Sequence, residues 1–71
     1  MDEQQIRNNF TYHEPIKDQS IRYGRLRNYA REMAEQINQL CPESREKSLA
    51  FTNLEQALMW ANASIARNET E

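Results

Sequence analysis

The sequence predicts an all-α fold, an antiparallel helical hairpin with a short N-terminal helix and arm, assembled into a homo-oligomer. Two long segments on either side of Cys41-Pro42 carry apolar residues at helical spacing. The second segment carries two apolar faces, whereas packing against one neighbour buries only one. A domain of 71 residues is marginally stable alone because it buries only about 60% of its unfolded surface. Its single cysteine cannot form an internal disulfide, so we expect association of copies to provide the missing stability.

The chain opens with a helix predicted over residues 2–9. Asp2 and Glu3 lie where the positive end of a helix dipole favours acidic side chains. Residues 10–18 are expected to form an ordered arm, because Pro15 keeps Glu14 away from the helical region. Phe10 is expected to pack this arm onto the hairpin.

The first long helix is predicted over residues 19–40, with Asp18 as its N-cap. An apolar stripe recurs along it at Leu26, Ala30, Met33, Ile37 and Leu40. The second helix is predicted from Pro42, which is favoured at the first helical position, to Arg67. A connection this short makes the two helices antiparallel neighbours. The tail 68–71 is expected to fray, and the whole of 1–71 forms one domain.

The two apolar faces of the second helix differ in character. One face matches the stripe of the first helix and contains Ala50, Phe51, Leu54, Ala57, Leu58, Ala61 and Ile65. The other contains Leu49, Met59, Trp60 and Ala63. A tryptophan outside the hairpin face favours a contact between copies of the chain.

Composition excludes several function classes. The net charge of −2 disfavours DNA and RNA, whose binding needs a basic surface. No apolar run approaches the roughly 20 residues of a membrane span, and the acidic N-terminus is not typical of a signal peptide. One unpaired thiol fits a reducing cytoplasm. Cys41 and His13 lack a third orienting group, and no metal-ligand or phosphate-loop spacing occurs, so we expect no catalysis, cofactor or metal.

Three groups of residues remain as candidates for binding. Four arginines and no acid occupy residues 22–31, at Arg22, Arg25, Arg27 and Arg31. They form either a solvated helix surface or a phosphate site, since guanidinium binds phosphate in a forked geometry. Tyr12 and His13 can stack on a nucleobase. Ser44, Lys47 and Ser48 lie at a helix start, where backbone N–H groups bind anions or where ordinary capping occurs.

The second-helix residues Ser44 to Ala50, Thr52, Leu54-Glu55, Met59 to Asn62 and Ile65 to Arg67 resemble a signature of the phage anti-CBASS sponge family (anti-CBASS protein two). The arm residues 10–13 and the Arg22-Tyr23 and Leu26-Arg27 pairs match as well, so that the resemblance spans roughly residues 4–68. It implies a homohexamer in the cytoplasm of the infected bacterial host. Such a hexamer sequesters cyclic dinucleotides such as cyclic GMP–AMP without cleaving them and blocks the CBASS effector. A second site for cyclic trinucleotides is also implied.

The resemblance also implies residue roles. Tyr12 would stack on a base and Arg27 would pair with a phosphate, in a dinucleotide site that also includes His13, with weaker parts for Ser44, Lys47 and Ser48. Arg67 and Thr52 would belong to the cyclic trinucleotide site. The alternative is a structural or adaptor hairpin whose arginines serve solubility and partner contacts.

Overall fold

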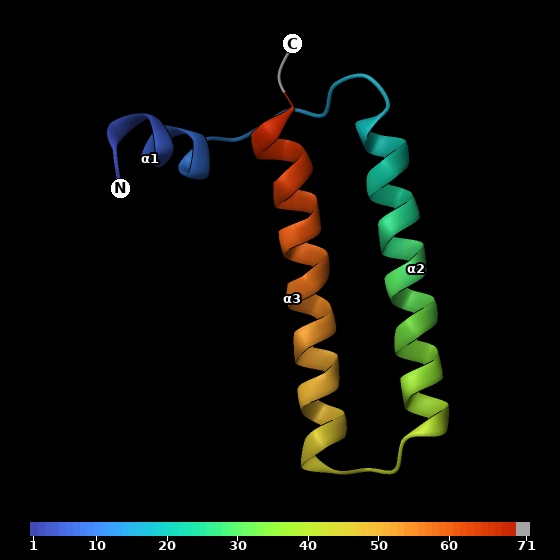
Figure 1. The fold of residues 1–71 in the computed structure, drawn as a ribbon. Helices are drawn as coiled ribbons and strands as arrows, with labels where there is room; N and C mark the ends of the chain where they lie inside the picture. Colours follow the sequence, from blue (N-terminus) through green and yellow to red (C-terminus); the bar gives the residue numbers. More distant parts are fainter. Residues whose placement is uncertain (70–71) are drawn as a thin grey trace.

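The computed structural model describes residues 1–69, and these fold into three helices joined by short connections. They are α1 (Glu3–Phe10), α2 (Gln19–Leu40) and α3 (Arg45–Asn68). Figure 1 shows α2 and α3 side by side and antiparallel, with α1 standing to one side of α3. The predicted all-helical hairpin with a short N-terminal helix is thus confirmed. Over residues 1–69, no helix combines the length and apolarity that crossing a bilayer requires.

Helix α1 is capped at its start and stands apart from the hairpin. The Asp2 side chain accepts a hydrogen bond from the Gln5 N–H at 2.7 Å, which satisfies one of the unpaired donors of a helix start. Asn8 Nδ2 donates to the Arg67 carbonyl at 3.0 Å and ties α1 to the end of α3. The expectation that Phe10 packs onto the hairpin is wrong, because its side chain ends an outlying helix and is 82% exposed.

The turn between the long helices differs from the prediction by three residues. Helix α3 begins at Arg45 rather than Pro42, because Ser44 is its N-cap. Ser44 is extended (φ −170°, ψ 166°), and its hydroxyl accepts from the Lys47 N–H at 3.1 Å. The same hydroxyl donates to the Pro42 carbonyl at 3.1 Å, so residues 42–44 form the turn. Asp18 occupies the N-cap of α2 without a capping bond from its side chain.

The chain folds into a thin layer. It measures 44 × 29 × 13 Å and has a radius of gyration of 15.3 Å, against about 11 Å for a globular domain of this length. None of the apolar side chains between residues 1 and 69 is fully buried. Ala57, predicted on the hairpin face, is exposed. Two helices alone can shield only the strip between them, and that strip is half-buried.

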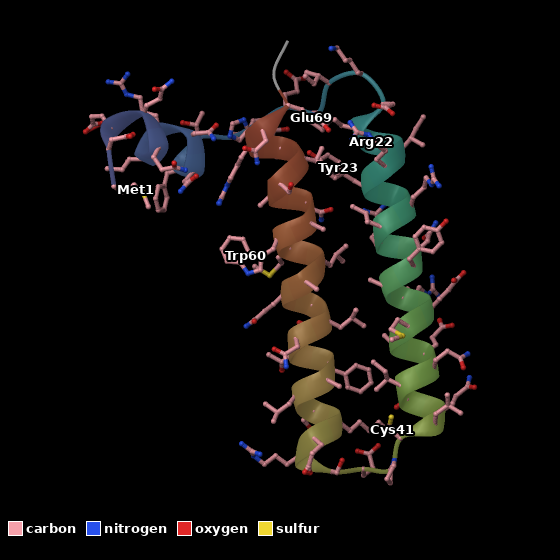
Figure 2. All side chains as sticks on the ribbon, viewed as in Figure 1. Met1, Arg22, Tyr23, Cys41, Trp60 and Glu69 are labelled. Atoms are coloured by element: carbon pink, nitrogen blue, oxygen red, sulfur yellow. The ribbon has the colours of Figure 1, made fainter. Side chains whose placement is uncertain are left out.

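Large apolar side chains consequently remain in contact with solvent. On α3, the predicted second face is exposed, with Trp60 at 65% and Met59 at 66%. Figure 2 shows Trp60 pointing away from α2. Further exposed apolar side chains are Met1, Ile6, Ile21, Tyr29, Met33, Leu40 and Leu49.

Candidate functional site

The arm, α2 and α3 together line a shallow, open hollow near the open end of the hairpin. Its volume is about 390 Å³, and it is lined by His13, Tyr23, Arg27, Asn62, Ala63 and Ala66. The hollow exists because Ala63 and Ala66 present only methyl groups where larger side chains would fill the space. Figure 2 places Tyr23 between α3 and the start of α2. The fold therefore brings together His13 and Arg27, two residues predicted to bind the same ligand.

Arg27 supplies the positive charge of this hollow. Within residues 1–69 its guanidinium makes no ion pair, whereas Arg22 pairs with Asp18 and Glu69 and Arg31 pairs with Glu35 at 3.2 Å. An unpaired guanidinium lining a hollow is able to donate two parallel hydrogen bonds to the oxygens of a phosphate. Of the four arginines in the 22–31 cluster, Arg27 thus combines an uncommitted charge with a position in this hollow.

Polar groups surround this charge. His13 Nε2 lies 2.8 Å from the Asn8 carbonyl oxygen, and because a carbonyl only accepts, Nε2 donates this bond. His13 Nδ1 is the ring nitrogen left over for another partner. Asn62 Oδ1 is buried and accepts no hydrogen bond from residues 1–69. A buried acceptor without a donor costs about 1–3 kcal/mol, so a ligand N–H group would be stabilised here once the amide turns its oxygen toward the hollow.

Tyr12 precedes His13 but does not line the hollow. Its side chain is 81% exposed, and Thr11, the residue before it, has the extended backbone that ends α1. An exposed phenol ring on an arm is available to stack on a group that covers the hollow.

The three residues predicted near the start of α3 lie at the other end of the hairpin. Ser48 and Asn62 are 14 positions apart on one helix, which is about 21 Å. Lys47 is 6% exposed, and its ammonium group donates to the Asn38 carbonyl at 3.2 Å and to the Glu43 carboxylate at 2.7 Å. One protomer therefore does not bring Ser44, Lys47 and Ser48 together with His13 and Arg27.

Arg67 lies between α1 and the end of α3. Its guanidinium carbon is 5.9 Å from the centre of the Trp60 ring, a cation–π distance, and Nη2 donates to the Asn9 carbonyl at 3.5 Å. It lines a second hollow of about 310 Å³ that also contains Trp60. Thr52 is 15 positions away on α3, about 22 Å, so one protomer does not unite it with Arg67.

Cys41 and His13 lie at opposite ends of α2, since Cys41 caps its C-terminal end and His13 lines the hollow with Tyr23. Eighteen positions of helix, about 27 Å, separate Tyr23 from Cys41. Across residues 1–69, no three His, Cys, Asp or Glu side chains are grouped as a metal site requires.

Tyr23 and Asn62 line the hollow but were not predicted to do so. Asn62 left a weak signal, since it is a polar residue between two alanines in the apolar part of the second helix. Tyr23 left none, because its position depends on how α2 meets the arm.

The family model described as "Acb2/Tad1, hairpin domain" matches residues 1–66, which include α1, the arm, α2 and all but the end of α3. No curated protein and no solved structure matches the chain. The family is one of ligand-binding hairpin domains, in agreement with a hairpin that holds a polar hollow at its open end. A match over almost the whole length establishes the assignment: this chain belongs to the Acb2/Tad1 hairpin-domain family.

Proposed function

We propose that this chain is a phage-encoded immune-evasion protein that binds cyclic oligonucleotide signals and sequesters them without cleavage. The family supports an anti-CBASS or anti-Thoeris sponge role. The observation that carries the proposal is the hollow, where an unpaired guanidinium, an anchored imidazole and an unsatisfied amide oxygen converge. Those groups complement a phosphate, a base and an exocyclic amine. Sequestration in the host cytoplasm would keep the CBASS effector inactive.

Each group has a role toward a cyclic dinucleotide such as cyclic GMP–AMP. Arg27 pairs with a phosphodiester, while Tyr12 and His13 stack on a base, a contact worth about 1–3 kcal/mol. Asn62 Oδ1 accepts from an exocyclic amine. Ser44, Lys47 and Ser48 are weaker candidates, since they reach a ligand at this hollow only from a second copy.

The functional unit in this proposal is a homo-oligomer, with a hexamer as the expected state. A 13 Å layer with no fully buried apolar side chain among its described residues gains stability when copies cover its exposed faces. Association would also close the open hollow. The Arg67–Trp60 hollow is the proposed cyclic trinucleotide site, with Thr52 contributed by another copy.

Calorimetry with a panel of cyclic dinucleotides and trinucleotides tests the binding. We expect heat and a thermal shift with at least one of them, and intact ligand after the complex is denatured. Linear product would contradict sequestration. Absence of both heat and thermal shift would favour the adaptor hairpin instead, a candidate that the exposed Trp60 face supports.

The Trp60→Ala variant tests the assembly. Truncating a tryptophan buried between copies costs a few kcal/mol, so we expect a lower melting temperature and partial dissociation in sedimentation. Unchanged mass and unchanged melting would place Trp60 outside the contact between copies.

A further inference from the structure

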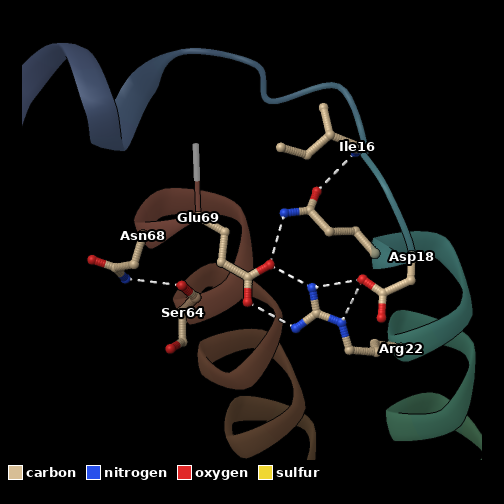
Figure 3. A network of polar contacts seen from close by, with 7 residues as sticks. Ile16, Asp18, Arg22, Ser64, Asn68 and Glu69 are labelled. Atoms are coloured by element: carbon tan, nitrogen blue, oxygen red, sulfur yellow. Dashed lines mark hydrogen bonds and ion pairs between the residues drawn. The ribbon is translucent and has the colours of Figure 1, made fainter. Parts of the chain in front are cut away.

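We infer that Gln19 is a positioning residue, whose side-chain amide is oriented by Glu69 and holds the arm in the place that the ligand needs. This inference rests on the proposed function. It concerns the end of the hairpin where the arm enters α2 and where α3 ends, the network drawn in Figure 3.

Gln19 is a buried polar residue that connects three segments. It is only 3% exposed, although glutamine is usually found at the surface. Its Oε1 accepts from the Ile16 N–H of the arm at 3.0 Å, and its Nε2 donates to Glu69 Oε1 at 3.1 Å. The Gln19 backbone N–H also donates to the Ile16 carbonyl at 3.0 Å. Both ends of the amide are therefore used.

Glu69 determines which way this amide faces. A carboxylate only accepts, so the amide must present its N–H₂ group to Glu69 and its oxygen to the Ile16 N–H. The opposite orientation would set oxygen against oxygen and donor against donor. Glu69 is itself held by Arg22, whose Nη1 donates to Glu69 Oε2 at 2.8 Å and whose Nη2 contacts Glu69 Oε1. Arg22 Nε in turn donates to Asp18 Oδ1 at 3.2 Å, as Figure 3 shows.

The held segment is the one that carries the site. Ile16 is three residues from His13, so their Cα atoms are at most about 11 Å apart. Lys17, which follows Ile16, has a φ of 52°, a backbone conformation that non-glycine residues adopt only when their surroundings impose it. The contacts of Gln19 with Ile16 span this residue and supply that constraint.

Glu69 lies outside residues 1–66, the part that the family model matches. The side chain that orients the amide is thus supplied by the short segment that follows the matched region.

Three variants and a control test the inference, each measured for cyclic GMP–AMP affinity and for amide hydrogen-exchange protection in the free protein. Gln19→Met keeps the volume and removes both hydrogen bonds, and Glu69→Ala removes the orienting carboxylate. We expect Ile16 protection and affinity each to fall about 5- to 10-fold in both, because both variants weaken the one hydrogen bond that holds the Ile16 N–H. Mid-helix protection of α2 and α3 should be unchanged. Glu35→Ala, which removes the carboxylate of an exposed ion pair on α2, should match the wild type.

The Gln19→Glu variant reads the orientation directly. At neutral pH two carboxylates face each other and Ile16 protection falls. Lowering the pH below about 4 lets the pair share a proton, so that an O–H donates to Glu69 and a C=O accepts from Ile16, as the amide does. The charged groups that neighbour this pair are Arg22, Lys17 and Asp18, and the guanidinium of Arg22 stays cationic throughout. We expect Ile16 protection to recover in acid in this variant alone.

Unchanged protection and affinity in Gln19→Met, when the wild type binds, would overturn the inference and leave the proposed function intact. A loss of affinity that follows global melting in every variant would also overturn it. A wild type that binds no cyclic nucleotide would overturn the proposed function itself, and with it the link from Gln19 to a ligand.

Discussion

The two ends of the hairpin hold their polar groups together in different ways. At the turn end the contacts are local, since Lys47 bonds to Ser44, Glu43 and Asn38. At the open end they join segments far apart in the chain, as Gln19 and Arg22 do with Glu69. At the turn end the charge of Lys47 is already bonded within the fold, whereas at the open end Arg27 lies unpaired beside a hollow. A basic residue therefore indicates a site only where the fold has not already used its charge.

Arg27→Ala is the change with the largest expected effect, because it removes the charge of the open end. Hydrogen bonds to charged groups contribute about 1.5–3 kcal/mol, so we expect the affinity for cyclic GMP–AMP to fall about 10- to 150-fold in calorimetry while the assembly persists. Arg31→Ala, one turn further along α2 and already paired with Glu35, is the control. Equal losses of affinity in the two variants would show that only the overall surface charge matters, not the position of Arg27.

Lys47→Met should destabilise the turn end of the hairpin and leave the hollow of the same chain unchanged. It leaves the Asn38 carbonyl and the Glu43 carboxylate without their donor, so we expect the free energy of unfolding to fall by about 1.5–3 kcal/mol in denaturant titrations. Ligand affinity should stay at the wild-type value if the hollow of one chain is the whole site, and should fall if Lys47 of a second copy reaches the ligand. A weakened affinity with unchanged stability would bring the turn end of a second copy into the binding site.

The contrast between the ends explains what the sequence could predict. Helical periodicity is local, so α2 was predicted with its observed limits and α3 differs only at its ends. The preference of proline for a first helical position suggested Pro42 as the start of α3. The helix begins at Arg45 instead, because the Ser44 side chain caps it by accepting from the Lys47 N–H. The tail was expected to fray from residue 68, yet Asn68 is helical and Glu69 is ion-paired; residues 70–71 lie outside the described part.

The site was predictable only in part. Arg27 and His13 were identified from residue type and resemblance, and the fold places them in one hollow. The sequence did not predict Asn62, Gln19 or Glu69, because their surroundings come from segments distant in sequence. No spacing rule encodes a pairing such as Gln19 with Glu69. Ligand binding stays a prediction for every site residue: Tyr12, His13, Arg27, Ser44, Lys47, Ser48, Thr52 and Arg67.

Gly24→Ala is expected to have a smaller effect on stability, and it tests whether anything approaches the α2 backbone at the open end. Alanine is favoured over glycine inside a helix by about 1 kcal/mol, and a Cβ at residue 24 would meet only Arg27 Nη2 at an ordinary 3.8 Å. We therefore expect a higher melting temperature and unchanged ligand affinity. A sharp loss of affinity would show that the ligand or a second copy approaches the α2 backbone there.

Of the four predictions, destabilisation of the open end by acid is expected to have the smallest effect. Hydrogen bonds from Arg22, and then from Gln19, lower the pKa of Glu69 from 4.5 to about 2. Because the folded pKa is depressed, this carboxylate stabilises the fold above its ordinary pKa, and the contribution is lost as the pH falls from about 4.5 to about 2. An NMR titration of the Glu69 carboxyl carbon checks this; titration near 4.5 would mean that Arg22 does not hold it in solution.

The central claim is that copies of this chain associate and hold cyclic nucleotides intact at the open ends of their hairpins. Native mass spectrometry after incubation with cyclic GMP–AMP and related cyclic nucleotides tests it most directly. We predict a multimer whose mass includes whole ligands, released unchanged when the assembly is dissociated. A single 8.5 kDa chain without ligand at micromolar concentration, across every cyclic nucleotide offered, would contradict it.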